Sequence, residues 1–231
     1  MARAPISVVI PTLNAASALA PCLGALGEGL NAGLIREVIV TDGGSSDGTL
    51  ELADQAGAVI VKGDASRGGQ LRRGCEAAQG EWLLIVHADS WLEEGWTESV
   101  LRHLASDEGC AGYFRLRFRA KGLAPRIVEN WANMRSRFFG MPYGDQGLLI
   151  RRDMYDDVGG FADIPLMEDV AIARNLKGRL EPLSATIATS ADRYLRDGWA
   201  RRSFRNGLTL MRYLLGVDPE RLRRDYSSKG N

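Results

Sequence analysis

The sequence has few cysteines, no excess of charge of either sign and no long apolar run, and each shortage excludes a class of protein. Its 231 residues include only three cysteines, Cys22, Cys75 and Cys110, an odd number in no metal-binding pattern. Such spacing favours small buried side chains in a reducing compartment over a disulfide framework. Basic and acidic side chains balance at 29 each. We therefore expect no nucleic-acid partner, because a general nucleic-acid binder carries a basic excess.

Apolar runs are too short for a membrane protein. No stretch approaches the roughly 18 consecutive apolar residues of a membrane-spanning helix. Near the N-terminus, Pro11 and Asn14 interrupt the run 6–10 before it reaches the length of a signal-peptide core. We therefore expect a cytoplasmic protein without a transmembrane segment.

What the sequence does contain is an alternation of apolar runs with segments of helical spacing. The runs lie at 6–10, 37–41, 58–61 and 82–86, and the helical segments at 15–28, 49–56 and 67–78. This order predicts an α/β fold with a Rossmann-like, mostly parallel sheet and helices on both faces. The run 82–86 has no polar alternation, which is typical of a strand buried on both faces.

The pattern changes after residue 95. We expect helices at 96–105, 125–138, 153–158, 168–176 and 199–215, and strands at 110–119, 147–151 and 185–189. Alternation in 110–119 predicts one exposed basic face, made of Tyr113, Arg115, Arg117 and Arg119. No linker is apparent, so we expect a single domain, 1–231. It comprises a nucleotide-binding half (1–90), a smaller acceptor and catalytic lobe (91–190) and an arginine-rich helical tail (191–231).

A polar cluster with His87 and Asp89 follows the run 82–86 directly. In open α/β sheets, ligands bind beyond the carboxyl ends of the strands. Because Mg²⁺ is often held by one or two carboxylates plus substrate phosphates, Asp89 is a candidate metal ligand. The alternative is that Asp89 caps the next helix. His87 is either a weak ligand, a group that supports the ligands or a buried core histidine.

Two more polar segments lie at expected strand–helix junctions. Asp42 begins a loop of turn-forming residues, where it either binds a base or ribose or serves the turn itself. The loop has neither the Gly-x-Gly-x-x-Gly fingerprint nor a P-loop sequence. Arg67 precedes two glycines at a helix start, and it either contacts a nucleotide or is solvated.

Charged residues also mark the second half. Glu168 and Asp169 open an expected helix, where carboxylates suit the helix dipole. The functional alternative is a general base that takes a proton from an attacking hydroxyl. Arginines of the tail either grip a diphosphate, face anionic lipid or are solvated. They are Arg193, Arg196, Arg201, Arg202 and Arg205.

In order and spacing these segments resemble glycosyltransferase family 2. The resemblance rests on 8–14 (Val-Val-Ile-Pro-Thr-Leu-Asn), 37–49 (Glu-Val-Ile-Val-Thr-Asp-Gly-Gly-Ser-Ser-Asp-Gly-Thr), and 77–82 (Ala-Ala-Gln-Gly-Glu-Trp) leading to 87–90 (His-Ala-Asp-Ser). It extends through Gly-Gly-Phe at 159–161 and Glu-Asp at 168–169. Tyr-Gly-Asp-Gln-Gly at 143–147, with the arginine-rich end, resembles the short bacterial subgroup associated with arsenosugar biosynthesis.

The resemblance implies a GT-A fold, a nucleoside-diphosphate sugar donor, a divalent cation (Mn²⁺ or Mg²⁺) and inversion at the anomeric carbon. By position, it implies nucleotide contacts from Pro11, Thr12, Asn14, Asp42, Arg67 and Ala88. Asp89 is the remaining carboxylate of the family's Asp-x-Asp metal motif, and His87 stands at the first position, which departs from the pattern. Asp169 matches the catalytic base, with Glu168 as the second choice.

Contacts to the diphosphate or the acceptor are expected from Asp145, Gln146, Arg193, Arg201 and Arg202. The Gln-x-x-Arg-Trp motif of processive members is absent, so we expect one transfer per encounter. The expected acceptor is a small molecule or is lipid-linked. Peripheral membrane contact and self-association stay open.

Two other functions compete with this hypothesis. A nucleotidyltransferase would release pyrophosphate, but it usually carries a glycine-rich basic loop after the first strand, where residues 11–14 are Pro-Thr-Leu-Asn. A non-catalytic nucleotide-sugar-binding module is compatible with the incomplete Asp-x-Asp motif, and it would bind a donor without transferring the sugar.

Overall fold

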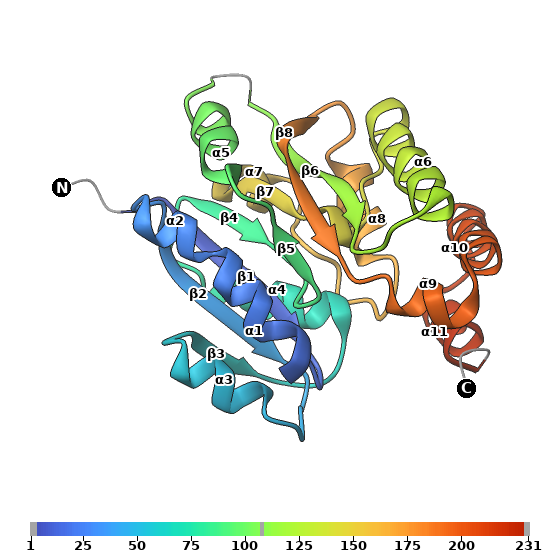
Figure 1. The fold of residues 1–231 in the computed structure, drawn as a ribbon, viewed down its shortest axis with the longest axis horizontal. Coiled ribbons are helices and arrows are strands. Elements are labelled where there is room, and N and C mark those ends of the chain that lie inside the picture. The colour runs from blue at the N-terminus through green and yellow to red at the C-terminus, as the bar shows by residue number, and fades with distance from the viewer. Residues whose placement is uncertain (1–3, 107–108, 229–231) are drawn as a thin grey trace.

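A single eight-stranded sheet forms the centre of the protein (Figure 1), seen in a computed structural model that describes residues 4–106 and 109–228. The strand order is β3-β2-β1-β4-β7-β6-β8-β5. The strands are β1 (Ile6–Thr12), β2 (Ile35–Asp42), β3 (Val59–Lys62), β4 (Trp82–Ile85), β5 (Ser90–Leu92), β6 (Ala111–Phe118), β7 (Leu148–Arg151) and β8 (Leu180–Thr189). The end residues 1–3 and 229–231, which the expected domain includes, lie outside the described part.

The first four strands along the chain are parallel neighbours, as the alternation predicts. Strand β1 lies between β2 and β4, and β2 pairs with β3, all in parallel. Strand β7 then joins β4 in antiparallel orientation and connects the second half of the chain to the first. Strand β8 runs parallel to β6 and antiparallel to β5. The expected mostly parallel α/β fold is confirmed.

Helices cover both faces of the sheet because strand residues alternate in direction. The helices are α1 (Ala16–Ala25), α2 (Gly27–Asn31), α3 (Thr49–Gln55), α4 (Arg67–Ala77), α5 (Trp96–Leu104), α6 (Leu123–Phe139), α7 (Arg152–Asp157), α8 (Glu168–Asn175), α9 (Asp192–Asp197), α10 (Trp199–Leu214) and α11 (Pro219–Ser228). Val8 packs with α1, α3 and α5 on one face, whereas Val9 packs with α4, α7 and α8 on the other. The end of β6 packs with α6, α9 and α10 in a third cluster.

Several expected elements differ in the structure. The expected helix 15–28 is two helices, α1 and α2, which meet at Leu26. Strand β8 begins at Leu180 rather than at residue 185. Its first half contains polar residues and a proline, so an apolar pattern does not predict it. Neither the three-residue strand β5 nor helices α9 and α11 were expected.

The expected basic face of the strand 110–119 is wrong at Tyr113. Arg115, Arg117 and Arg119 are exposed as expected, but Tyr113 is buried. The first half of β6 lies between β7 and β8 and is buried along its length. Alternation therefore appears only in the second half of the strand. Among the cysteines, Cys22 and Cys75 are buried, and Cys110 is only partly so.

In the described ranges, 4–106 and 109–228, no helix has the length and apolar character needed to cross a bilayer.

Candidate active site

A cavity of about 460 Å³ lies beyond the end of β4, where the two halves of the chain meet. Its walls come from the turn after β4, the 3₁₀ turn η1 (Gly144–Gln146), the start of α8, and helices α6, α9 and α10. Seven of the residues predicted from the sequence line it: Arg67, His87, Asp89, Asp145, Asp169, Arg193 and Arg202. Residues far apart in sequence thus meet at one opening.

Asp89 is held by the turn that joins β4 to β5. The backbone amide of Ser90 donates to the carbonyl of His87 at 3.0 Å, and the amide of Ser190 donates to the carbonyl of Asp89 at 3.1 Å. Ala88 is buried, while the Asp89 side chain is half-buried and lines the cavity. A carboxylate is therefore presented to the cavity from a rigid backbone.

The His87 ring fits against a backbone that lacks a side chain. A Cβ on Gly144 would lie 2.6 Å from both Cε1 and Nε2 of His87. Burial lowers the pKa of His87, and although Asp89 opposes the shift, nearby Arg67 and Arg193 add to it. A neutral imidazole therefore faces the cavity at neutral pH.

Asp169 and Glu168 begin α8 but point to different surroundings. Oδ2 of Asp169 accepts a hydrogen bond from the Gly144 amide at 2.8 Å, and Oδ1 accepts one from the Val170 amide at 2.7 Å. Met167, just before the helix, has a left-handed backbone with φ 69°, a conformation that occurs rarely outside glycine and asparagine. Asp169 lines the cavity as a result.

Glu168 is buried beneath this surface. Its Oε2 has no hydrogen-bond partner among the described residues. Burial, reinforced by the charge of Asp169, raises the pKa of Glu168 to about 7. Of the two carboxylates, only Asp169 is placed to meet a molecule in the cavity.

Asp145 adds a third carboxyl group to the cavity wall. Burial raises its pKa to about 6, with Arg135 opposing the shift and Asp169 and Asp89 adding to it. Its Oδ1 is buried without a partner in the described part of the chain. Three carboxyl groups on the wall of one cavity favour a cation.

Arg135 is a site residue that sequence reasoning missed. Its Nε donates to the Met141 carbonyl at 3.0 Å, and its guanidinium carbon lies 3.4 Å from the centre of the Tyr143 ring. It belongs to α6 and, like Asp145, lines the cavity. Its position on the buried side of the amphipathic helix α6 is the feature that could have identified it from the sequence.

Gln146 lies outside the cavity wall. It is fully buried, and its Nε2 donates to the Phe114 carbonyl at 3.1 Å while its Oε1 accepts from the Ser136 hydroxyl. The side chain fixes η1 between β6 and α6. Gln146 therefore helps to hold Asp145 and Gly144 in place, and its own side chain does not face the cavity.

The predicted nucleotide contacts in the loops after β1 and β2 do not line the cavity and form a second group. Thr12 and Asp42 are direct neighbours in the β1–β2 pairing. Asp42 is buried and accepts hydrogen bonds from Thr12, from the amides of Gly44 and Ser45 at 2.8 Å, and from the Ser45 hydroxyl. Although burial alone would raise it, these bonds hold the pKa of Asp42 below its ordinary value. Asp42 is thus an ionised carboxylate that organises the loop.

Asn14 connects the same two loops. It has a left-handed backbone with φ 50°, and its Oδ1 accepts from the Ser46 amide at 2.9 Å. Behind them, Nε2 of Gln70 donates to the carbonyls of Thr12 and Thr41 at 2.7 and 2.9 Å. Gln70 was not predicted, since nothing in its sequence neighbourhood marks a buried amide. Pro11, in β1, is half-buried.

The tail arginines fall into three environments. Arg202 is buried, forms an ion pair with Asp197 at 2.8 Å and donates to the Tyr226 hydroxyl. Arg193 is exposed and lines the cavity, whereas Arg201 is exposed and outside it. Tyr226 places α11 against α10, so the tail closes one side of the cavity.

The fit of a divalent cation can be judged from these donors. Within the described residues, no three His, Cys, Asp or Glu side chains converge as a preformed metal site. Mg²⁺ and similar ions often need only one or two carboxylates together with substrate phosphates and water. Asp89 and the unpartnered Oδ1 of Asp145 supply that smaller set. The residues fit a cation that binds together with a phosphorylated ligand.

Comparison with solved structures identifies related folds. S. aureus TarS 1-349 in complex with UDP superposes with a TM-score of 0.62 at 16% identity, covering 80% of this chain and 60% of that one. Glucosyl-3-phosphoglycerate synthase from Mycobacterium tuberculosis, in complex with Mn²⁺, UDP and glucosyl-3-phosphoglycerate, gives 0.56 at 18% identity, with coverages of 80% and 70%. These likenesses confirm the expected GT-A fold.

Sequence comparison gives the family. A PGL/p-HBAD biosynthesis glycosyltransferase of Mycobacterium bovis is 35% identical over 104 residues, which are 42% of this chain and 40% of the relative. The match thus spans less than half of that relative's length. The family model described as glycosyl transferase family 2 matches residues 7–162, including the turns that carry Asp42 and Asp89. With its fold and most of its length matched, the chain belongs to glycosyltransferase family 2.

Proposed function

We propose that the protein transfers a sugar from a nucleoside-diphosphate sugar to an acceptor hydroxyl, with inversion at the anomeric carbon and one transfer per encounter. The observation that carries the proposal is the placement of Asp169 and Asp89 on the walls of one cavity. A base for the acceptor and a ligand for the donor's cation are thereby brought to the same space.

The donor's nucleoside is assigned to the loops after β1 and β2. Pro11, Thr12 and Asn14 lie beside Asp42 at the carboxyl ends of parallel strands, where α/β sheets bind ligands. Because Asp42 already accepts bonds from Thr12 and Ser45, a base or ribose would take the place of one of these hydroxyls. The UDP complexes of TarS and of glucosyl-3-phosphoglycerate synthase support a nucleotide of this kind.

The diphosphate is assigned to the junction between these loops and the cavity. Arg67 and Arg193 are exposed at the cavity from α4 and α9, and each offers a guanidinium that can bind phosphate oxygens. Asp89, with Asp145, would hold a divalent cation against the same oxygens. When bound, the cation offsets negative charge that develops on the departing diphosphate.

Asp169 is assigned as the general base. It takes the proton of the acceptor hydroxyl as the oxygen forms a bond to the anomeric carbon. The bond from that carbon to the diphosphate oxygen breaks on the opposite face, and the nucleoside diphosphate leaves with the electron pair. The Gly144 amide, 2.8 Å from Oδ2, orients the carboxylate for this step.

The first experiment identifies the donor and the cation. Nucleoside diphosphates and nucleotide sugars are screened for a rise in melting temperature with and without Mn²⁺, since a ligand that binds only the folded state raises it. Asp89→Ala should lose the Mn²⁺-dependent part of the rise, and Asp64→Ala, an exposed aspartate outside the cavity, should keep it.

The second experiment identifies the reaction. With a stabilising donor and a panel of acceptors, release of a nucleoside diphosphate with an inverted glycoside supports the proposal. Release of pyrophosphate would indicate nucleotidyl transfer instead. Donor binding with no turnover for any acceptor would indicate a binding module.

A further inference from the structure

Helix α6 exposes a continuous strip of large apolar side chains. Its members recur every three or four residues and so share one side of the helix. They are Leu123, Ile127, Trp131, Met134 and Phe138. Ile127 is 67% exposed and Phe138 is 72% exposed. Folded proteins rarely leave a large contiguous apolar surface in water unless it contacts something.

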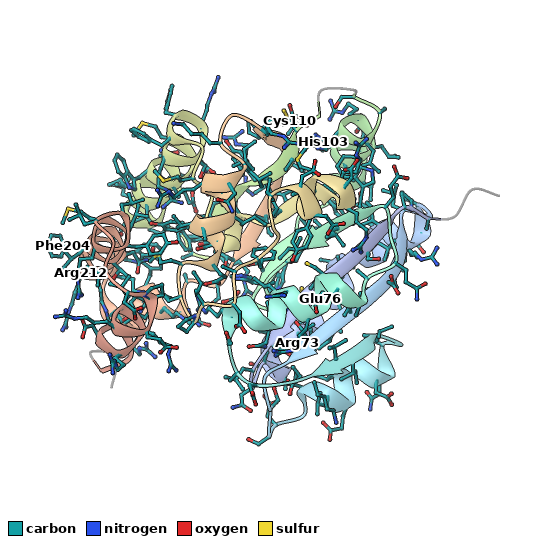
Figure 2. All side chains as sticks on the ribbon, turned by 180° about the vertical axis from the view of Figure 1, so that it is seen from behind. Arg73, Glu76, His103, Cys110, Phe204 and Arg212 are labelled. Carbon is teal, nitrogen blue, oxygen red and sulfur yellow. The ribbon has the colours of Figure 1, made fainter. Side chains whose placement is uncertain are left out.

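Helix α10 carries a second strip of the same kind. It consists of Phe204, Leu208, Met211 and the helix-capping Leu215. The two helices contact each other at one end of the molecule (Figure 1), and Phe204 projects away from the body of the protein (Figure 2). We call the two strips together the α6–α10 face.

Exposed arginines flank this face. Helix α10 contains four arginines and no carboxylate, but Arg202 is buried in an ion pair with Asp197 and Arg212 pairs with Asp225 of α11. Helix α6 contains three arginines and one glutamate, Glu129. Arg126, Arg137 and Arg201 are exposed beside the apolar side chains. An apolar strip flanked by arginines is the pattern of a helix that lies in the interface of an anionic membrane.

The cavity reaches the same face. Trp131 and Phe139 of α6 line the cavity, and both are more than half exposed. Leu210 lines it from α10. A surface that covered the α6–α10 face would therefore lie at the mouth of the cavity that contains Asp169.

We propose that the α6–α10 face docks on an anionic lipid bilayer. Phe138 and Phe204 enter the boundary between headgroups and acyl chains, and Arg126, Arg137 and Arg201 contact lipid phosphates and carboxylates. A second copy of the chain fits the face less well, because a two-fold interface packs the same face of both copies together and would bring exposed arginines of one copy near those of the other. Docking goes beyond the proposed reaction and can be measured without donor or acceptor.

The test is cosedimentation of the full chain with vesicles. Vesicles of phosphatidylcholine with about 30 mol% phosphatidylserine should bind the protein, and binding should fall as salt is added. Phe138→Ser with Phe204→Ser should weaken binding at least about tenfold, since two large apolar side chains lose their burial. The matched control is Leu30→Ser with Leu101→Ser, which removes two exposed leucines from α2 and α5. Equal weakening by the control pair would overturn the proposal.

A charge variant tests the same surface with little risk to folding. Each exposed arginine near an anionic surface contributes roughly fivefold or less to binding. Arg126→Gln with Arg137→Gln should therefore weaken binding to these vesicles about tenfold. Lys62→Gln with Lys177→Gln, two exposed lysines on β3 and just after α8, should leave binding unchanged. Unchanged binding in the arginine variant would show that these arginines do not contact anionic lipid, and this would overturn the proposal.

Light scattering separates a bilayer from a second copy. The proposal expects the same molar mass for the wild-type protein and for the Phe138→Ser, Phe204→Ser variant. A dimer that this variant dissociates, with no vesicle binding by either protein, would assign the face to self-association. Nucleotide-induced stabilisation of the variant should equal that of the wild-type protein, so a failed docking test leaves the proposed reaction independently testable.

Discussion

The backbone amide of Gly144 donates a hydrogen bond to Oδ2 of Asp169 at 2.8 Å, across 25 positions of sequence. This bond joins η1 to the first turn of α8. The same glycine lies against the His87 ring, where a Cβ would come within 2.6 Å. One residue without a side chain thus sets the mutual position of Asp169 and of the turn that carries Asp89.

Asp169→Asn should abolish most turnover while leaving donor binding intact. The amide keeps the shape of the side chain but cannot take the acceptor's proton, and loss of a general base costs about 10²–10⁴ in rate. Steady-state rates and the donor-induced rise in melting temperature measure the two effects. Asp157→Asn, an exposed position at the end of α7, is the control and should match the wild-type rate. Normal turnover in Asp169→Asn would reject the base assignment.

Asp42→Asn should reduce both stability and nucleotide binding. The carboxylate accepts from two amides and two hydroxyls, and an asparagine nitrogen cannot accept from any of them. Leaving buried donors unpaired costs about 1–3 kcal/mol. Denaturant titration measures the free energy of unfolding, with Asp54→Asn on the exposed side of α3 as the control. A variant as stable as the control, with normal nucleotide binding, would show that Asp42 does not organise this loop.

Glu168→Gln should become more stable relative to the wild-type protein as pH rises. Burial raises the pKa of Glu168 from 4.5 to about 7, so the folded protein binds this proton more tightly than the unfolded chain does. Stability from the protonated form is fully present below pH 4.5 and is lost as pH rises through about 7. The difference between variant and wild-type protein should grow across this window and level off above it. The total change in the stability difference is of the order of 3 kcal/mol, because each unit between the folded and unfolded pKa values contributes 1.36 kcal/mol.

Parallel unfolding curves at pH 5, 6, 7 and 8 check the Glu168 prediction. Glu51→Gln, on the exposed surface of α3, provides the baseline. A constant difference between Glu168→Gln and the wild-type protein across these pH values would mean that Glu168 is not held protonated.

Gly68→Ala should destabilise the start of α4. A Cβ at this position would lie 2.0 Å from the carbonyl oxygen of Ala162 and 2.8 Å from the amide nitrogen of Ile164, both backbone atoms. Forcing the two segments apart costs about 1–3 kcal/mol. Gly24→Ala in α1 meets nothing within 4 Å and should instead stabilise by about 0.5–1 kcal/mol, because alanine favours helix. Similar unfolding free energies for the two variants would contradict the packing described.

The fold could be predicted where the sequence pattern is local. Unbroken apolar runs such as 82–86 and turn-rich junctions such as the one after Asp42 predict parallel strands and their order along the chain. Strand β5 could not be predicted, because its three residues form a strand only through pairing with β8. The buried position of Tyr113 likewise follows from strands on both sides of β6, which are distant in sequence.

The candidate site divides in the same way. Asp89 and Asp169 could be chosen from motifs, and the structure brings both to one cavity. Arg135 and Gln70 could not, because their roles depend on which distant backbone carbonyl or ring lies beside them. The motif ranks Asp169 ahead of Glu168, and the structure separates them by burial, because Glu168 is buried and Asp169 is only partly so.

Strand β7 pairs with β4, and the Ser190 amide binds the carbonyl of Asp89 at 3.1 Å. The edge of β4 and the Asp89 turn are therefore completed by segments that are synthesised later than they are. A fragment ending near residue 90 would expose the edge of β4 and leave the Asp89 turn without its backbone partner. Such a fragment would be prone to pair with other chains through that open edge, so the two halves depend on each other for solubility as well as for chemistry.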